Sequence, residues 1–137
     1  MDELRERSSR QIRALGLPEA VVRIALDGGE AVSSALSYRA QSVWAAPAEA
    51  VMNGTSEELF PLWSCGTTHA FAGQDRYLLW SPETAQPYAV FDSFAKLVRE
   101  LLTELYEDEV DEDERVRIAR LLLREADVAA ALVPVAR

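Results

Sequence analysis

Four residues in the middle of the chain have side chains that can take part in nucleophilic catalysis. Ser64, His69 and Asp75 offer a hydroxyl nucleophile, a general base and a group that can orient the base, and Cys65 offers a thiol. No surrounding motif fixes the geometry that this chemistry needs, and the neighbours of Cys65 supply no positive charge to activate it. We interpret them as a turn serine, a hydrogen-bonded strand histidine and an inert cysteine, and we expect no catalytic residue and no enzyme activity.

Carboxylates are the second group of side chains that can do chemistry, and many of them lie in one segment, Glu104 to Glu114, which we call the acidic window. It holds eight of the 23 acidic residues and no Lys or Arg, whereas the remaining chain has fifteen acidic and fourteen basic residues. Asp111 and Asp113 have calcium-loop spacing, but Arg115 and Val116 stand where that loop needs an oxygen ligand and a glycine. A weak cation site stays an alternative. We expect no bound metal and no cofactor.

The acidic window has two interpretations. It is either a solvated connector between helices, since like charges repel and stay in water, or a landing surface for a basic partner. The tryptophans are also ambiguous, because Trp63 and Trp80 end strands, where exposure is plausible, but large aromatic residues are also the main filler of a small core. The predicted partner-binding residues are Tyr106, Glu107, Asp108, Glu109, Asp111, Glu112, Asp113, Glu114, Trp63 and Trp80.

Composition narrows the class of protein. The chain has 137 residues, of which 49% are hydrophobic, which suits one domain with a core of its own. A net charge of −9 argues against nucleic acid and anionic membranes as partners. With a single cysteine, no apolar signal core at the N-terminus and no apolar run that spans a bilayer, we expect a cytoplasmic protein whose partner is another protein.

The elements that must position these residues are helical at both ends and β-like in the middle. Apolar spacing predicts a helix over 2–15 and a second helix that starts at Pro18 and stops at 27–29. A weaker strand signal covers 37–44. Short apolar runs over 59–63, 67–72, 76–80 and 87–91, separated by turn residues, predict an antiparallel meander.

The clearest periodic signal follows the last strand. Asp92 or Ser93 is a strong candidate to cap a helix over 93–106, whose apolar face includes Leu97, Leu101 and Leu105. A further helix over 115–124 is predicted after the acidic window, and Asp127 is expected to cap a last short turn. The sequence therefore predicts an α+β fold with a central antiparallel sheet between N-terminal and C-terminal helices.

The segments 59–63, 76–80 and 89–94, with Gly66 between them and the amphipathic helix after Ser93-Phe94, resemble the SUKH superfamily. The step from Leu17-Pro18 through a helix to Gly28-Gly29 is similar in outline to the pattern of that family. Thr67-Thr68 depart from it, because they stand where its members have an acidic residue.

The resemblance covers most of the chain and implies a single SUKH-like domain over 1–137, in which 107–137 is a C-terminal helical extension beyond the common core. It implies a binding protein, because the superfamily contains many bacterial immunity proteins of polymorphic toxin systems and a fungal cell-wall-synthesis regulator. We therefore expect a protein that neutralises a cognate toxin, with a regulatory or scaffold subunit as the alternative. No binding residue is transferred from the family.

Overall fold

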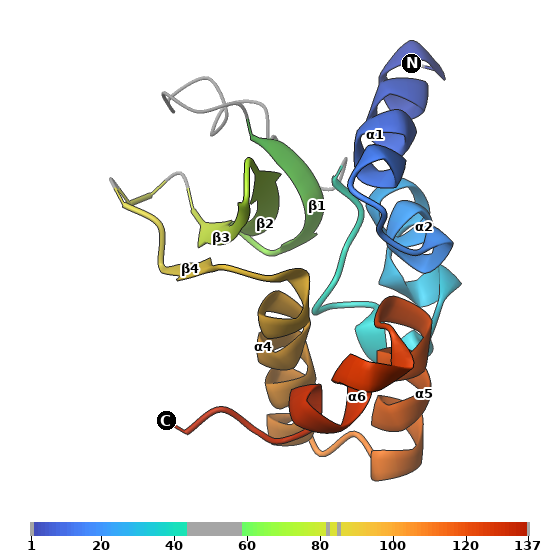
Figure 1. The fold of residues 1–137 in the computed structure, drawn as a ribbon, viewed down its shortest axis with the longest axis vertical. Coiled ribbons are helices and arrows are strands. Elements are labelled where there is room, and N and C mark those ends of the chain that lie inside the picture. Colours follow the sequence, from blue (N-terminus) through green and yellow to red (C-terminus); the bar gives the residue numbers. More distant parts are fainter. Residues whose placement is uncertain (1, 44–58, 82, 85, 137) are drawn as a thin grey trace.

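The computed structural model describes residues 2–43, 59–81, 83–84 and 86–136, and this part of the chain forms an α+β fold. The helices lie on one side of a four-stranded antiparallel sheet (Figure 1). The helices are α1 (Asp2–Ala14), α2 (Glu19–Asp27), α4 (Phe94–Glu107), α5 (Glu112–Leu122) and α6 (Glu125–Ala131), with the 3₁₀ turns η1 (Gly29–Ala31) and η2 (Ser34–Leu36). The strands are β1 (Phe60–Cys65), β2 (Thr68–Gly73), β3 (Arg76–Trp80) and β4 (Ala89–Phe91).

The sheet is the meander that the short apolar runs predict. Its strand order is β1-β2-β3-β4, and each neighbouring pair is antiparallel. The register places Ser64 opposite His69 and Leu79 opposite both Ala70 and Ala89. An irregularity between Pro61 and Trp63 shifts the register of β1.

The prediction of a strand over 37–44 is wrong for residues 37–43, which are the part of this range that the structure describes. The chain there follows η2 and meets β1 in a single bridge, in which Gln41 and Ser64 exchange backbone hydrogen bonds of 2.6 and 2.9 Å. Trp44 lies outside the described residues. The bridge matters for function because it fixes Tyr38 and Arg39 beside the end of β1.

The N-terminal helices have nearly the predicted bounds. Pro18 is the residue before α2, with a φ of −63° and a ψ of 158°, and is therefore a cap rather than the first helical residue. Ile12 of α1 and Val21 and Ile24 of α2 are fully buried. Both helices pack beside β1 (Figure 1).

The helix predicted after Ser93 is confirmed as α4. The Ser93 hydroxyl accepts a hydrogen bond of 3.3 Å from the Lys96 amide, which caps the helix. Leu97, Leu101 and Leu105 are at most 2% exposed, as their spacing predicts. This apolar face leaves the opposite, polar face of α4 available for function.

The helix predicted over 115–124 begins earlier than expected, inside the acidic window. Asp111 caps α5 through a hydrogen bond of 2.9 Å from the Glu114 amide to its carboxylate. Acidic side chains suit this position because the first turn of a helix carries partial positive charge. The expected cap at Asp127 is wrong, since α6 starts at Glu125 and Asp127 lies within its first turn.

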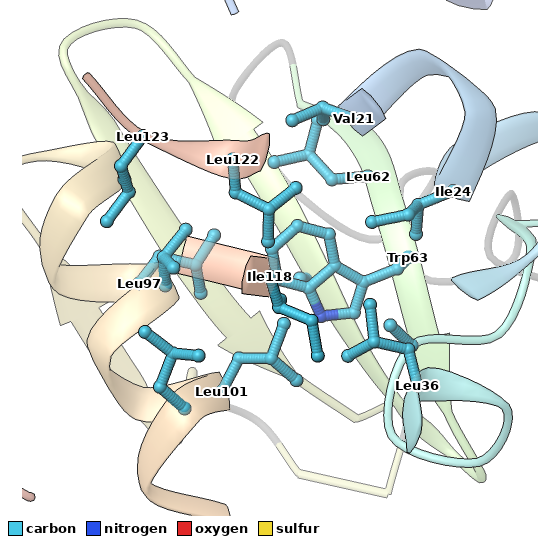
Figure 2. Packing of buried hydrophobic residues seen from close by; sticks show 14 of the residues in the cluster. Val21, Ile24, Leu36, Leu62, Trp63, Leu97, Leu101, Ile118, Leu122 and Leu123 are labelled. Atoms are coloured by element: carbon cyan, nitrogen blue, oxygen red, sulfur yellow. The ribbon is translucent and has the colours of Figure 1, made fainter. Parts of the chain in front are cut away.

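The main hydrophobic cluster joins both ends of the chain to the sheet. Trp63 lies with Leu36, Leu101, Ile118 and Leu122 in this cluster (Figure 2). A smaller cluster on the other face of the sheet contains Leu59, Phe71 and Leu78, with Trp80 packed against it. Since α5 contributes to the main cluster, the C-terminal helices belong to the same core as the sheet.

Candidate functional site

The structure brings two of the three residues that could form a catalytic triad together and leaves the third apart. The Ser64 hydroxyl and His69 Nδ1 are 2.8 Å apart across the β1–β2 pair, and both residues are at most 1% exposed. Asp75 is exposed in the turn at the opposite end of β2. The four strand steps from His69 to Gly73, at roughly 3.3 Å each, span about 13 Å, and Asp75 lies beyond Gly73 in the turn, too far to orient the imidazole. The interpretation of His69 as a hydrogen-bonded strand histidine is confirmed.

Burial also sets the charge of His69. Burial lowers the pKa of its imidazole, because water no longer stabilises the charged form. The ring lies edge-on to Phe71, with 5.9 Å between ring centroids. The neutral imidazole of His69 and the hydroxyl of Ser64 therefore form a buried structural pair beside Phe71.

The two described tryptophans differ from the predicted surface anchors. Trp63 is 3% exposed and packs edge-on to Phe94 at 6.3 Å between ring centroids, so it is a core residue, which corrects its prediction as a partner-binding residue. The bulge in β1 turns this large side chain into the main cluster. Trp80 is half-buried, and its indole N–H donates a hydrogen bond of 3.0 Å to the Thr84 carbonyl. Its polar edge is therefore already occupied.

The acidic window is not uniform. Glu104, Asp108, Asp111 and Glu114 each make hydrogen bonds inside the chain, so part of the concentrated charge has a structural use. By contrast, the side chains of Glu109, Glu112 and Asp113 are exposed around the junction of α4 and α5. The bonded residues have a structural role, and the role of the exposed ones as a landing surface stays a prediction.

Tyr106 is the aromatic residue of the acidic window and is 52% exposed. The guanidinium of Arg115 lies over its ring, 5.2 Å from the centroid. The ring is therefore accessible on its outer side, and its inner side already faces a cation. Tyr106 remains a possible contact residue at the end of α4.

Arg39 joins the segment after η2 to the acidic window by hydrogen bonds. Its Nε and Nη2 atoms each donate a hydrogen bond of 2.8 Å to the Asp108 carboxylate, and its Nη1 donates one of 3.1 Å to Glu104. The bond to Asp108 is the main reason that the pKa of Arg39 is raised, and the same bond lowers the pKa of Asp108. Two parallel bonds to one carboxylate are a strong geometry for an arginine. Arg39 thus anchors the segment after η2 to α4.

A groove of about 650 Å³ opens beside Arg39, between the helix-facing side of the sheet and α4. The hairpin turn at Gly66 and Thr67 closes one end, and Tyr88 and Ala89 line it from the start of β4. Glu100 and Glu104 line it from α4. We call this hollow the groove.

The groove combines exposed aromatic rings with carboxylates. Tyr38 is 59% exposed and Tyr88 is 55% exposed, and both rings line it. Its charged lining residues are Glu100, Glu104 and Arg39, and Arg39 bonds both Glu104 and Asp108. Two carboxylates against one guanidinium give the lining a net negative charge beside aromatic surface, which suits a cationic ligand.

Cys65 also lines the groove, but its thiol is not activated. Burial raises the pKa of Cys65 first and the charge of Glu104 raises it further, while Arg39 opposes them. A thiol with a raised pKa carries less of the reactive thiolate at neutral pH. Its place in the groove is that of a small, half-buried lining residue.

Sequence reasoning did not identify Tyr38, Arg39, Tyr88 or Glu100. Glu100 and Glu104 did leave a signal, because two acidic residues four apart on the polar face of an amphipathic helix lie side by side. The Arg39 contacts left none, since its carboxylate partners are 65 and 69 residues away in the chain. Such pairings appear only once the chain is folded.

Neither a metal-ligating cluster nor a membrane-spanning helix is found among the described residues. In residues 2–43, 59–81, 83–84 and 86–136 there is no group of three or more His, Cys, Asp or Glu side chains placed to hold a metal ion. No helix in the described part of the chain has both the length and the apolar character needed to cross a membrane.

Comparison of the chain with protein-family models, with curated proteins and with solved structures finds no match. The resemblance to the SUKH superfamily stays a prediction from the sequence. Function is therefore argued from the chemistry of the groove and of the acidic window.

The contacts of Glu114 predict how stability depends on pH. Arg117 Nε and Nη2 donate hydrogen bonds of 3.0 and 2.7 Å to its carboxylate, and the Ser33 hydroxyl donates another. The Arg117 bonds first and the Ser33 bond second lower the pKa of Glu114 from 4.5 to about 2. A lowered pKa means that this contribution to stability is complete above pH 4.5 and is lost as the pH falls toward 2.

We therefore expect Glu114→Gln to lower the free energy of unfolding near neutral pH by no more than about 1 kcal/mol, because Arg117 is exposed and Glu114 is partly in contact with solvent. The difference from the wild type should shrink as the pH falls through about 4. Urea denaturation at a series of pH values measures it, with the exposed Glu112→Gln as a control. A Glu114→Gln difference that stays constant down to about pH 2 would contradict the assignment.

Proposed function

We propose that this chain is a protein-binding protein that neutralises a basic bacterial toxin, and that it does so with the groove and the neighbouring acidic window. The observation that carries the proposal is the groove itself, where exposed tyrosines and carboxylates share one hollow. Aromatic residues are favoured anchors of protein interfaces, and a negative surface guides a positive partner into place. This combination suits recognition of a protein better than it suits catalysis.

The exposed carboxylates of the acidic window support a basic partner. Glu109, Glu112 and Asp113 lie in solvent beyond Asp108, which bonds Arg39 at the end of α4. Charges at the rim of an interface mainly speed association, and their effect falls with salt. An acidic surface of this kind can take the place of nucleic acid on a basic nuclease-like toxin.

The sequence resemblance supports the immunity role in particular. The segments that carry the resemblance to the SUKH superfamily include Gly66, Ala89 and the Ser93-Phe94 junction. Gly66 and Ala89 also line the groove. Proteins of that superfamily include many immunity proteins, and we extend this role to the present chain as part of the proposal.

We propose no catalytic role for Ser64, Cys65 or His69. Ser64 and His69 are buried and bonded to each other, and the pKa of Cys65 is raised. A nucleophile has to reach its substrate and needs a base that is itself oriented. The groove is thus a surface for binding.

The association rate tests the acidic window. We expect the triple variant Glu109→Gln, Glu112→Gln, Asp113→Asn to bind the partner with an association rate about 10-fold lower at low salt, because electrostatic steering is removed. The partner is first isolated from a native lysate with the chain as bait, and stopped-flow kinetics with the purified protein then follow. Only exposed side chains are changed, so the Arg39 bonds and the Asp111 cap are left intact.

The matched control is the triple variant Glu6→Gln, Glu30→Gln, Glu83→Gln. It changes three exposed acidic residues outside the acidic window, and thus alters the net charge by the same amount. Its association rate should stay close to that of the wild type. Equal rates for both triple variants, with the same dependence on salt, would show that the acidic window only faces solvent.

The biological role is tested separately by growth. Expression of the partner alone should arrest growth, and co-expression of this chain should restore it. A partner that binds but does not affect growth would instead indicate a regulatory or scaffold subunit. The growth assay does not locate the binding surface, which the association rates of the two triple variants test.

A further inference from the structure

Arg39 shows how the polar face of α4 holds a guanidinium group. It bonds Glu104 and Asp108, which are four residues apart, and its Cζ atom lies 5.7 Å from the centroid of the Tyr38 ring. Residues four apart on a helix lie on the same face, so their two carboxylates meet the planar fork of an arginine together. The chain thus contains one guanidinium site built from two carboxylates and a tyrosine.

A second pair of carboxylates lies one turn earlier on α4, along the groove, and shares Glu104 with the Arg39 site. Glu100 and Glu104 are also four residues apart, and both line the groove. Tyr88 lines it from the side of the sheet, with a side chain that is 55% exposed. The groove lies within the range of about 300–1,000 Å³ that is typical of pockets for small ligands, so a side chain from outside fits in it.

We propose that the groove binds the guanidinium group of an arginine that a protein partner presents, with Glu100 and Glu104 as carboxylate contacts and Tyr88 as the aromatic contact. The inference rests on the proposed function and names the group that the basic partner inserts. Arginine fits better than lysine, because its planar, weakly hydrated group pairs with two carboxylates and also stacks on an aromatic ring. Phosphate groups are disfavoured by the same carboxylates.

A small probe tests the chemistry without the partner. We expect N-acetyl-arginine methylamide to bind with a dissociation constant on the order of millimolar and to shift the backbone amide signals of Gly66, Tyr88 and Glu100 in nuclear magnetic resonance spectra. N-acetyl-citrulline methylamide has nearly the same shape but no charge, and should leave these signals unchanged. Equal shifts with both probes, shifts centred on α5, or no shifts would overturn the inference.

Two variants of the groove and two matched controls locate the site. Glu100→Gln and Tyr88→Ala should each weaken binding of the arginine probe by about 2- to 5-fold, as loss of one half-buried charge or one exposed cation–π contact implies. Glu112→Gln and Tyr106→Ala remove an exposed carboxylate and an exposed tyrosine outside the groove, and should not change it. Equal weakening in all four variants would overturn the inference.

The isolated partner separates this inference from the proposed function. If a basic partner binds with salt-dependent kinetics but Glu100→Gln and Tyr88→Ala have no effect, the arginine site is wrong and the proposed function stands. If the arginine probe binds as expected but the partner is not basic, the proposed function fails and the site stands. Weaker partner binding in both groove variants, with the Glu6→Gln, Glu30→Gln, Glu83→Gln variant unchanged, supports the two together.

Discussion

Leu101→Ala is expected to lower the free energy of unfolding by about 2–5 kcal/mol, the usual cost of removing a buried leucine side chain. Leu101 is 2% exposed and lies in the same buried cluster as Trp63 and Ile118 (Figure 2). Alanine would leave a cavity that the packed neighbours fill only in part. Because a small domain is stable by only about 5–15 kcal/mol, equilibrium denaturation with urea should detect the loss clearly.

Leu121→Ala provides the control for the loss at Leu101. Leu121 is on α5 and is 40% exposed, so the same substitution there removes little buried surface. We expect a change within about 0.5 kcal/mol, which is usual for surface positions. Equal losses at the two positions would mean that the face of α4 has been assigned wrongly.

The parts of the fold that could be predicted are those where local pattern and tertiary packing agree. The 3.6-residue spacing of Leu97, Leu101 and Leu105 predicts α4, because a helix must bury one apolar face. Ser93 marks its start, since the side chain can bond an amide that the helix leaves without a partner. The strands lie within about two residues of the predicted runs, because Gly66, Gly73 and the turn after Trp80 end them.

Other parts depend on contacts that local pattern does not contain. The segment 37–43 contains amino acids typical of a strand, but it makes only the single bridge from Gln41 to Ser64. The start of α5 was missed because clustered acidic residues are typical of a solvated connector. In the structure the same residues, Glu112 to Glu114, form the first turn of a helix that Asp111 caps, where negative charge is favourable.

The candidate site could be predicted only in part, for the same reason. The acidic window is visible in the composition, but its division into bonded and exposed residues follows from the position of Arg39 in the fold. Arg39 joins the segment after η2 to α4, and that segment also carries Tyr38. The groove is thus made from residues that are distant in sequence and are brought together by one arginine and one bridge to β1.

Gly28 and Gly29 contact the segment that carries Tyr38 and Arg39. The sequence indicated these two glycines only as the end of a helix. Gly28 has a φ of +91°, which favours glycine, and it ends α2. Gly29 is needed for a close approach instead. Its amide donates a hydrogen bond of 2.6 Å to the carbonyl of Ala40, the residue after Arg39.

Gly29→Ala is expected to lower the free energy of unfolding by about 3 kcal/mol or more, at the upper end of the cost of overpacking a core. A Cβ atom at Gly29 would lie 2.5 Å from Leu36 Cβ, 2.6 Å from the Leu36 carbonyl oxygen and 2.7 Å from the Ala40 carbonyl oxygen. Two of these three atoms belong to the backbone, so no change of side-chain rotamer removes the clash. The segment that carries Tyr38 and Arg39 would have to move, and binding at the groove should weaken as well.

Gly16→Ala separates this clash from simple backbone strain. Gly16 has a φ of +76°, but a Cβ atom there would meet no other atom within 4 Å. Its expected cost is therefore only about 1–2 kcal/mol, that of an alanine in the left-handed region, with no loss of binding at the groove. Urea denaturation and titration with the arginine probe measure both variants. If Gly29→Ala were no more destabilising than Gly16→Ala, the close packing of Gly29 against residues 36–40, and with it the placement of Arg39, would be wrong.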